Sequence, residues 1–195
     1  MRRPKDEGFR VRATRVGSRK PEVRFEPTPR HIVRAMLELA ELTARDTVYD
    51  LGSGDGRIVI TAAREFGARG VGIENDPERV EQAESRARAA GVTRRVRFLR
   101  EDLFAADVSP ASVVTLFLLE EANLILRPRL RRTLAPGARV VSYLHDMGNW
   151  KPAKAQYTVD RLGWYHRIYL WVIPPAVEEL RPAPATTPPI ASRAQ

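Results

Sequence analysis

The sequence predicts an α/β protein with a Rossmann-like sheet, in which five parallel strands precede a C-terminal antiparallel hairpin and helices cover both faces. First, a β-branched and aromatic stretch at residues 47–49 runs into three alternating glycines and then into residues with helical spacing. Second, short apolar strands alternate with helical segments as far as residue 144, which produces right-handed βαβ units and a parallel sheet. Third, the two strand-like segments within residues 156–173 have no helix between them, which is typical of a hairpin.

The first ordered element is expected after Phe25-Glu-Pro-Thr-Pro29. Thr28 is a residue type that caps helices, and proline is favoured at the first helical position, so we expect a helix from Pro29 to about Leu42. The strand that follows ends in an acid, Asp50, and the glycine turn then leads into an amphipathic helix.

The later segments follow the same logic. Residues 69–75 predict a strand that ends in an acid, and Asp76 is expected to cap a helix that Pro77 starts and Gly91 stops. Apolar runs predict further strands, and periodic runs predict helices. These are a strand at 96–99, a strand at 112–119 that is apolar enough to be buried on both faces, a helix at 120–134 interrupted at Arg127-Pro128, a strand at 139–144 after the turn Pro136-Gly137, and hairpin strands at 156–160 and 165–173.

The composition predicts one globular domain with a tail at either end. Residues 1–24 are expected to be a basic disordered arm, 25–173 the folded domain, and 174–195 a disordered tail with six prolines in 22 residues. No apolar run approaches the roughly 18 residues of a membrane span, and the first ten residues lack the apolar region of a secretory signal. Cysteine is absent, which excludes disulfides, thiolate metal sites and a cysteine nucleophile. We expect a cytoplasmic protein.

The positive charge is concentrated near the N-terminus. The net charge is +9, and residues 1–30 carry ten basic and four acidic side chains, a net of +6. Such an arm suits nucleic acid, an anionic membrane or an acidic protein partner. Basic termini are also often solvated segments without a partner, and these alternatives stay open.

The glycine turn favours one cofactor class. In the dinucleotide-binding pattern G-x-G-x-x-G the third glycine allows close helix–strand packing, whereas here Arg57 occupies that position. A carboxylate at Asp50 would repel a pyrophosphate but suits the cationic methionine end of S-adenosylmethionine (SAM). The stretch Val48-Tyr-Asp-Leu-Gly-Ser-Gly-Asp-Gly-Arg-Ile58 resembles motif I of the seven-stranded class I SAM-dependent methyltransferases. The competing interpretation is a strand, turn and helix that bind no ligand.

Three acids, Asp50, Glu74 and Asp102, lie at or just after the ends of consecutive predicted strands, and such ends line one crevice in an open α/β sheet. The resemblance implies that Asp50 and the glycine turn face the methionine moiety of SAM. It also implies that Glu74 accepts both ribose hydroxyls and that Asp102 and Leu103 lie at the adenine. The full set of expected cofactor-binding residues is Pro27, Thr28, Asp50, Gly52, Ser53, Gly54, Gly56, Glu74, Asn75, Asp102, Leu103 and Thr115.

Further segments narrow the resemblance. These segments are Glu26-Pro-Thr-Pro29, motif I, Val71-Gly-Ile-Glu74, Val113-Val-Thr-Leu-Phe-Leu-Leu119, Val140-Val-Ser-Tyr143 and Trp150-Lys-Pro152. With them, residues 25–152 resemble the small seven-stranded protein-lysine methyltransferases of archaea, bacteria and mitochondria. The mitochondrial members of that family modify the adenine nucleotide translocase and the ATP synthase c subunit. The resemblance implies methyl transfer from SAM to the ε-amine of an accessible lysine on a protein.

The acceptor side carries weaker signals. The N/D-P-P-Y segment of enzymes that methylate nucleobase amines is absent after the fourth strand, which disfavours such substrates. An RNA or small-amine acceptor, and a non-catalytic SAM-binding module, remain the alternatives. Glu120, Tyr143, His145 and Asp146, near the carboxyl ends of the fourth and fifth strands, are the candidates for assisting loss of the lysine proton. Phe117 and Trp150 are the candidates for lining the substrate channel, and the alternative for Trp150 is packing on the hairpin. No metal is expected, because the three histidines lack ligand spacing.

Overall fold

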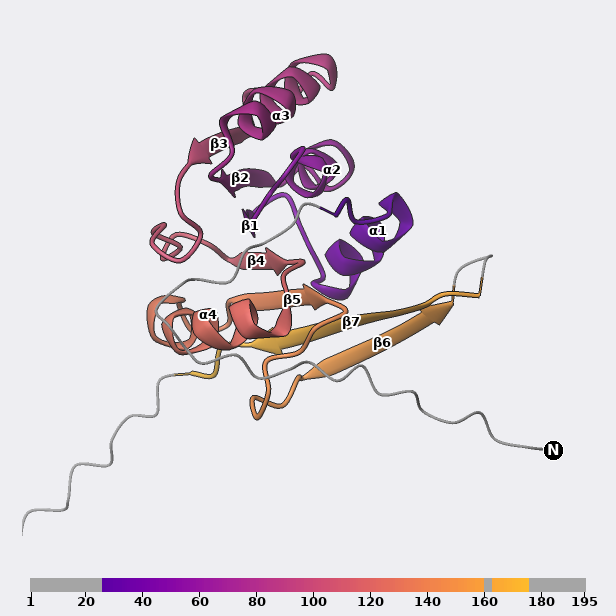
Figure 1. The fold of residues 1–195 in the computed structure, drawn as a ribbon, viewed down its shortest axis with the longest axis vertical. Coiled ribbons are helices and arrows are strands. Elements are labelled where there is room, and N and C mark those ends of the chain that lie inside the picture. The colour runs from indigo at the N-terminus through magenta and orange to yellow at the C-terminus, as the bar shows by residue number, and fades with distance from the viewer. Residues whose placement is uncertain (1–25, 160–162, 176–195) are drawn as a thin grey trace, which may run out of the picture.

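The computed structural model describes residues 26–159 and 163–175, which form a three-layer α/β fold (Figure 1). A seven-stranded sheet with the order β3-β2-β1-β4-β5-β7-β6 lies at its centre. Strands β1 to β5 pair in parallel, and β7 pairs antiparallel with both β5 and β6. The predicted fold class, five parallel strands with a C-terminal antiparallel hairpin, is confirmed.

The elements follow the predicted alternation along the chain. They are α1 (Arg30–Leu39), β1 (Thr47–Leu51), α2 (Arg57–Phe66), β2 (Arg69–Glu74), α3 (Pro77–Ala89), β3 (Val96–Arg100), β4 (Val113–Leu116), α4 (Glu120–Thr133), β5 (Arg139–Tyr143), β6 (Lys154–Val159) and β7 (Tyr165–Val172). The expected cap of α3 is confirmed, since the Asp76 side chain accepts a hydrogen bond from the Glu78 N–H at 2.9 Å.

The start of α1 differs from the prediction. Pro29, not Thr28, is the N-cap, and its carbonyl accepts hydrogen bonds from the N–H groups of Ile32 and Val33. Thr28 is buried and makes no cap hydrogen bond, because it faces the cavity described below. The helix also ends at Leu39 rather than near Leu42, because the chain turns there to enter β1.

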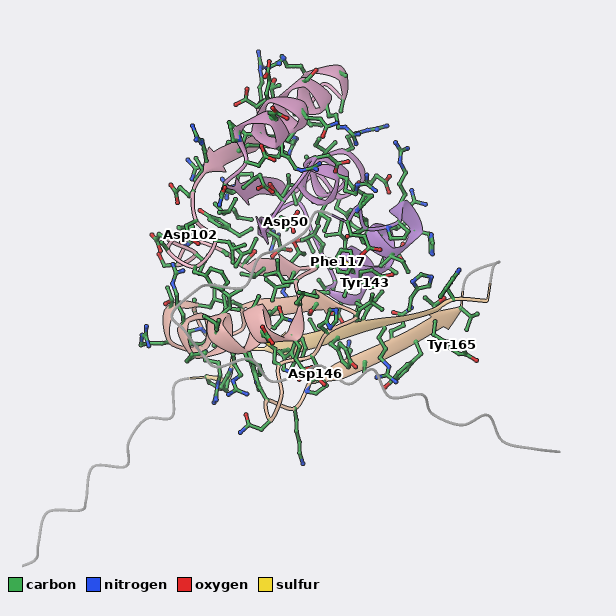
Figure 2. The ribbon with its side chains drawn as sticks, in the orientation of Figure 1. Asp50, Asp102, Phe117, Tyr143, Asp146 and Tyr165 are labelled. Atoms are coloured by element: carbon green, nitrogen blue, oxygen red, sulfur yellow. The ribbon has the colours of Figure 1, made fainter. Side chains whose placement is uncertain are left out.

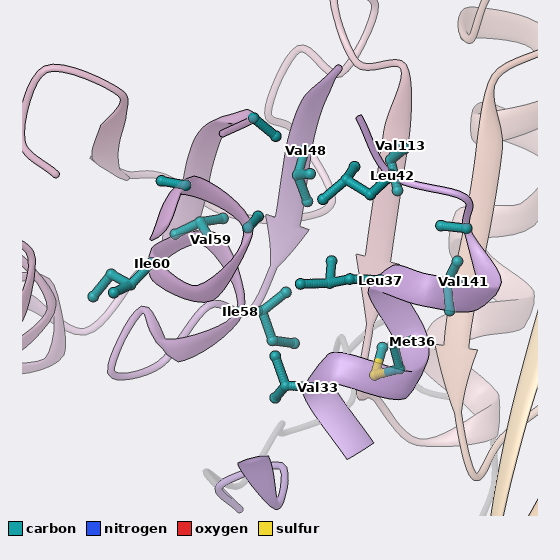
Figure 3. Packing of buried hydrophobic residues seen from close by; sticks show 14 of the residues in the cluster. Val33, Met36, Leu37, Leu42, Val48, Ile58, Val59, Ile60, Val113 and Val141 are labelled. Atoms are coloured by element: carbon teal, nitrogen blue, oxygen red, sulfur yellow. The ribbon is translucent and has the colours of Figure 1, made fainter. Parts of the chain in front are cut away.

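Two apolar clusters cover the two faces of the sheet. Helices α1 and α2 pack on one face of the sheet, against side chains such as Val48 of β1, Val113 of β4 and Val141 of β5 (Figure 3). Helix α4 packs on the other face, against the residues next to these in the same strands, including Tyr49 and Val140. Adjacent residues of one strand therefore enter opposite clusters, which explains why the central strands are apolar at nearly every position.

Two predictions about the fourth βα unit are wrong. Strand β4 is four residues long, and residues 117–119 form the loop that leads into α4. Helix α4 continues through Pro128 without interruption. Burial of Leu126 and Leu130 against the sheet holds both sides of the proline in one helix, although proline lacks the N–H of a helical hydrogen bond.

The hairpin extends the sheet beyond β5. Strand β7 begins at Tyr165, three residues before Ile168, which pairs with the last residue of β5, Tyr143. The expected arm at 1–24 and nearly all of the expected tail at 174–195 lie outside the described residues. Within the described ranges no helix has the length and apolar character needed to cross a membrane.

Candidate active site

A cavity of about 550 Å³ opens at the carboxyl ends of β1, β2 and β3. Acidic side chains dominate its walls, with only two arginines to balance them. The charged lining residues are Glu26, Asp50, Asp55, Arg57, Glu74, Asp76, Arg79, Glu101 and Asp102. Cation binding is favoured in such a cavity, because its carboxylates create a negative potential in a partly enclosed space.

The glycine turn shapes the floor of the cavity. Gly52, Gly54 and Gly56 all have positive φ, between 51° and 80°, which side-chain-bearing residues rarely adopt. The N–H groups of Gly52 and Ser53 both donate to the carbonyl of Ile73 at 2.9 Å, which ties the turn to β2. A Cβ at Gly56 would lie 2.6 Å from the ring of Phe98, so the turn requires glycine there.

Asp50 is the most deeply placed acid of the cavity. Its side chain is buried, and the Thr115 hydroxyl donates to Oδ1 at 2.8 Å. Burial raises the pKa of Asp50 to about 7, against the lowering effect of the Thr115 hydrogen bond, and the nearby Asp55 and Glu74 carboxylates raise it further. The arrangement leaves Asp50 short of a cationic partner, which a bound ligand could provide.

Glu74 is held by backbone amides. Its Oε2 accepts from the Gly54 N–H at 2.9 Å, and its Oε1 accepts from the N–H groups of Asn75 and Asp76 at 2.8 and 3.0 Å. These bonds fix the carboxylate at the wall and occupy both lone pairs of Oε1, while Oε2 keeps one lone pair. Such a fixed acceptor can take a hydroxyl donor from a ligand at Oε2 without losing side-chain entropy on binding.

The third acid lies across the cavity. Asp102 accepts a hydrogen bond from the Phe104 N–H at 2.9 Å, and its carbonyl accepts from Ala105 and Ala106, so residues 102–106 form a compact turn. Leu103 and Phe104 add apolar surface to the same wall. Figure 2 shows Asp50 and Asp102 on opposite sides of the space between β1 and the turn after β3. An apolar wall with an adjacent carboxylate suits a planar aromatic ligand group with an amino donor.

Asp55 and Arg57 belong to the site although sequence reasoning missed their roles. The Asp55 carboxylate is buried and forms ion pairs with Arg57 at 2.6 Å and with Arg86 at 2.7 Å. Arg57 also donates to the carbonyl of Thr28 at 2.8 Å, which joins the segment before α1 to the glycine turn. Close helix–strand packing is achieved at Gly70, where a Cβ would lie 2.6 Å from Val59. The sequence does contain a signal for this ion pair, because Asp55 lies two residues before Arg57 in the glycine turn.

The expected cofactor-binding residues are largely brought together. Pro27, Thr28, Asp50, Gly52, Ser53, Glu74, Asn75, Asp102 and Leu103 line the cavity. Gly54, Gly56 and Thr115 are not among the lining residues, but each bonds to one that is. The Gly54 N–H donates to Glu74, the Gly56 N–H donates to the Ser53 carbonyl, and the Thr115 hydroxyl donates to Asp50. Their roles toward a cofactor stay predictions.

The expected acceptor-side residues are more dispersed. Phe117 lines the cavity, and its ring lies 4.6 Å from that of Tyr143, whose hydroxyl forms a 2.6 Å hydrogen bond with His166 Nδ1. Glu120 is exposed at the start of α4, and His145 follows the end of β5.

Trp150 lies apart from the cavity, packed on Trp171, whose Nε1–H donates to the Trp150 carbonyl at 2.6 Å. Its assignment to a substrate channel, and the assignments of the proton acceptors, stay predictions.

The cavity residues fit S-adenosylmethionine. The buried Ser53 hydroxyl has no hydrogen-bond partner among the described residues, which leaves it for a ligand. The acids suit a ligand with a sulfonium and an ammonium, Glu74 suits a ribose, and the Leu103 wall suits an adenine. In the described part of the chain, no group of three or more histidines, cysteines or acids is placed to hold a metal ion.

The sheet order and the acidic cavity beside the glycine turn define a class I methyltransferase. Residues 50–154 match the ANTKMT methyltransferase domain, and the chain belongs to this family, as the sequence motifs predicted.

Two curated relatives illustrate the range of the family. A protein-lysine N-methyltransferase of Saccharolobus islandicus (strain REY15A) is 44% identical over 154 residues, which are 78% of this chain and 95% of the relative. The adenine nucleotide translocase lysine N-methyltransferase of Mus musculus is 38% identical over 106 residues, 54% of this chain and 46% of the relative. The chain thus spans nearly all of the archaeal relative and about half of the mouse one.

A solved structure is also similar. It is described as an RNA methyltransferase from Salinibacter ruber in complex with S-adenosyl-L-homocysteine, with 52% sequence identity and a TM-score of 0.72. The match covers 79% of this chain and 97% of that one.

Proposed function

We propose that the chain is a SAM-dependent methyltransferase that modifies the ε-amine of lysine in a protein substrate. The observation that carries this function is the 44% identity to a protein-lysine N-methyltransferase over 95% of that enzyme's length. The prediction of SAM as the cofactor agrees with the demethylated cofactor in the Salinibacter structure and with the fit of the cavity.

Different cavity residues hold different parts of the cofactor. SAM, when bound, supplies a methyl group on a positively charged sulfonium. Asp50 and the glycine turn hold the methionine end, Glu74 the ribose and the wall at Asp102 and Leu103 the adenine. Each group is positioned by buried or backbone contacts before the ligand arrives, which reduces the entropy lost on binding.

The acceptor amine must lose a proton to become nucleophilic. Tyr143, with its hydroxyl bonded to His166, is the candidate nearest the cavity wall, since it contacts Phe117. Glu120 and His145 are the alternatives at the same edge of the sheet. The apolar ring of Phe117 suits the methylenes of a lysine stem, which can be buried while the amine reaches the cofactor.

An RNA acceptor is the second candidate, favoured by the description of the Salinibacter structure. The sequence after β4 argues against one such acceptor, because it lacks the N/D-P-P-Y segment of enzymes that methylate nucleobase amines.

The two acceptors are separated by labelling. The purified protein is incubated with methyl-labelled SAM and a whole-cell lysate, and the products are treated with protease or with nuclease. Loss of labelled macromolecule on protease treatment alone supports the proposal, and loss on nuclease treatment alone would reject it. Asp50→Ala serves as the inactive variant, and Glu81→Gln, on the exposed side of α3, as the matched control.

Two finer assignments complete the proposal. The absence of cysteine supports a cytoplasmic location, and the net charge of +6 in residues 1–30 supports an acidic partner for the N-terminal segment. Removal of residues 1–20 is expected to leave SAM affinity unchanged and to weaken the salt dependence of acceptor methylation.

A further inference from the structure

Exposed apolar side chains gather at one edge of the sheet. Among the residues that the structure describes, all large exposed apolar side chains except Ile125 and Val172 lie after β4, after β5 or on the outer half of the hairpin. Five of them are called the apolar ledge here: Leu119, Leu144, Tyr157, Val159 and Tyr165, with exposed fractions from 37% to 79%.

Phe117 and Tyr143 link the apolar ledge to the cavity. Phe117 lines the cavity and contacts Tyr143, and Leu119 and Leu144 follow these two residues closely in the chain. Tyr157, Val159 and Tyr165 share one face of the hairpin, because Tyr165 pairs with Val159 and the Tyr157 partner, Arg167, lies two residues further along β7. Figure 2 shows Phe117 and Tyr143 between Asp50 and Tyr165.

Leu119 is an unfavourable residue at its backbone position. It is the N-cap of α4, where serine, threonine, aspartate or asparagine would satisfy a free N–H of the first turn, and it makes no cap hydrogen bond. Its side chain is nevertheless 51% exposed, so packing does not explain the choice of leucine.

Leu144 is a second such residue. Its φ is 65°, and the His145 N–H donates to the Tyr143 carbonyl at 2.9 Å, which is the pattern of a γ-turn in its rare, strained form. Buried Asn123 holds this turn, because its Nδ2 donates to the carbonyls of His145 and Asp146 and to the Ser142 hydroxyl. A bulky residue is thus held in a conformation that favours glycine, and it is still 37% exposed.

Local conflicts of this kind concentrate at functional positions. The carboxylates of Glu120, Glu121 and Asp146 lie beside the apolar ledge in sequence and complement a cationic side chain. We propose that the apolar ledge docks the acceptor segment, a stretch of protein in which apolar residues flank the target lysine. The inference rests on the proposed function and adds the sequence character of the substrate.

The test uses two synthetic peptides as probes, one with leucine and phenylalanine around a central lysine and one with serine at those positions. Wild-type protein is compared with Leu119→Ser, Leu144→Gly and Tyr165→Ser. Val172→Ser is the matched control, because Val172 is exposed at the opposite end of β7. Methylation rate, SAM affinity and thermal unfolding are measured for each.

The proposal predicts that the apolar peptide is methylated with the higher kcat/KM. Each ledge variant is expected to lose about fivefold to tenfold of that value, the effect of one apolar side chain, while SAM affinity and the control stay unchanged. Leu119→Ser and Leu144→Gly are expected to raise the unfolding temperature, since each places the favoured residue at its position. A more stable protein with lower acceptor activity is a result that simple structural damage does not produce.

Two results would overturn the docking role of the apolar ledge without affecting the proposed lysine methylation. The first is an equal kcat/KM for both peptides. The second is unchanged activity in all three variants while lysines in the lysate are still methylated. A dimer in sedimentation velocity that dissociates in Leu144→Gly would assign the ledge to a second copy of the chain. Label confined to RNA in the lysate would reject the proposed function itself, and the ledge inference with it.

Discussion

The two halves of the carboxyl edge are built by different physical means. In the half formed by β1, β2 and β3, backbone amides and carboxylates within short loops shape a polar cavity, as at Gly54 and Glu74. In the half formed by β4, β5 and the hairpin, side chains from distant elements meet, as Asn123 does with Ser142 and Tyr143 with His166. The first half suits a cofactor whose chemical structure is fixed, and the second presents apolar and aromatic surface to a partner.

Cofactor specificity and acceptor specificity depend on different parts of the structure. A cofactor of fixed shape can be held by backbone geometry, which depends on a few glycines and acids. An acceptor that is itself a protein requires side-chain surface, and that surface depends on tertiary contacts. Substitutions in the first half are therefore expected to change SAM affinity, and substitutions in the second half to change kcat/KM for the acceptor.

The largest effect is expected at the glycine turn. Gly56→Ala places a Cβ 2.6 Å from the Phe98 ring in a backbone with φ of 76°, and we expect it to cost about 3 kcal/mol or more of unfolding free energy. Gly91→Ala is the control, because it has a similar φ of 69° but no atom within 4 Å of the added Cβ. Denaturant unfolding measures both, and equal losses would show that close packing at Gly56 contributes nothing.

The next effect concerns cofactor affinity alone. Glu74→Ala removes a carboxylate fixed by three backbone amides, and we expect SAM affinity to fall by about 1.5–3 kcal/mol with acceptor affinity unchanged. Calorimetric titration with SAM gives the affinity, and Glu84→Ala on the exposed side of α3 is the control. Unchanged binding would mean that another group holds the ribose.

The converse change lies in the acceptor half. Asn123→Ala releases the turn that carries Leu144 and leaves the His145 and Asp146 carbonyls without this donor, which we expect to cost about 1–3 kcal/mol of stability. The kcat/KM for the acceptor should fall while SAM affinity stays near the wild-type value. Equal losses of both quantities would contradict the separation of the two halves.

The last expected effect is a dependence on pH. The folded pKa of Asp50, about 7, lies above its ordinary value of 3.8, so the ligand-free protein binds a proton that the unfolded chain releases between these values. Stability of the ligand-free protein therefore falls as pH rises toward 7, whereas SAM affinity rises because the cation prefers the carboxylate. Thermal unfolding and calorimetry on either side of pH 7 measure both trends, and Asp50→Asn should remove them.

The cofactor half could be predicted because its determinants lie close together in sequence. Asp50, the glycines and Glu74 occur at strand ends that alternation alone identifies. From the sequence, Arg57 argues only against a dinucleotide-binding turn. Its bonds to Asp55 and to the Thr28 carbonyl are not predictable there, because they require the segment before α1 to pack beside α2.

The acceptor half could be predicted only in part. Tyr143 is predicted from the end of the fifth strand and Phe117 from the family resemblance. The pairing of Tyr143 with His166, however, joins residues 23 apart through an antiparallel ladder. No sequence pattern reveals the positive φ of Leu144, because the turn is held by Asn123 on a different element. The continuity of α4 through Pro128 likewise depends on burial against the sheet.

The proposed acceptor is the amine of a lysine side chain. Tandem mass spectrometry of proteins labelled in lysate by the wild-type enzyme, with Asp50→Ala as the inactive comparison, locates the transferred methyl group. We expect ε-N-methyllysine in segments where apolar residues flank the lysine. Methyl groups on another side chain, or on RNA with unmodified protein, would contradict it.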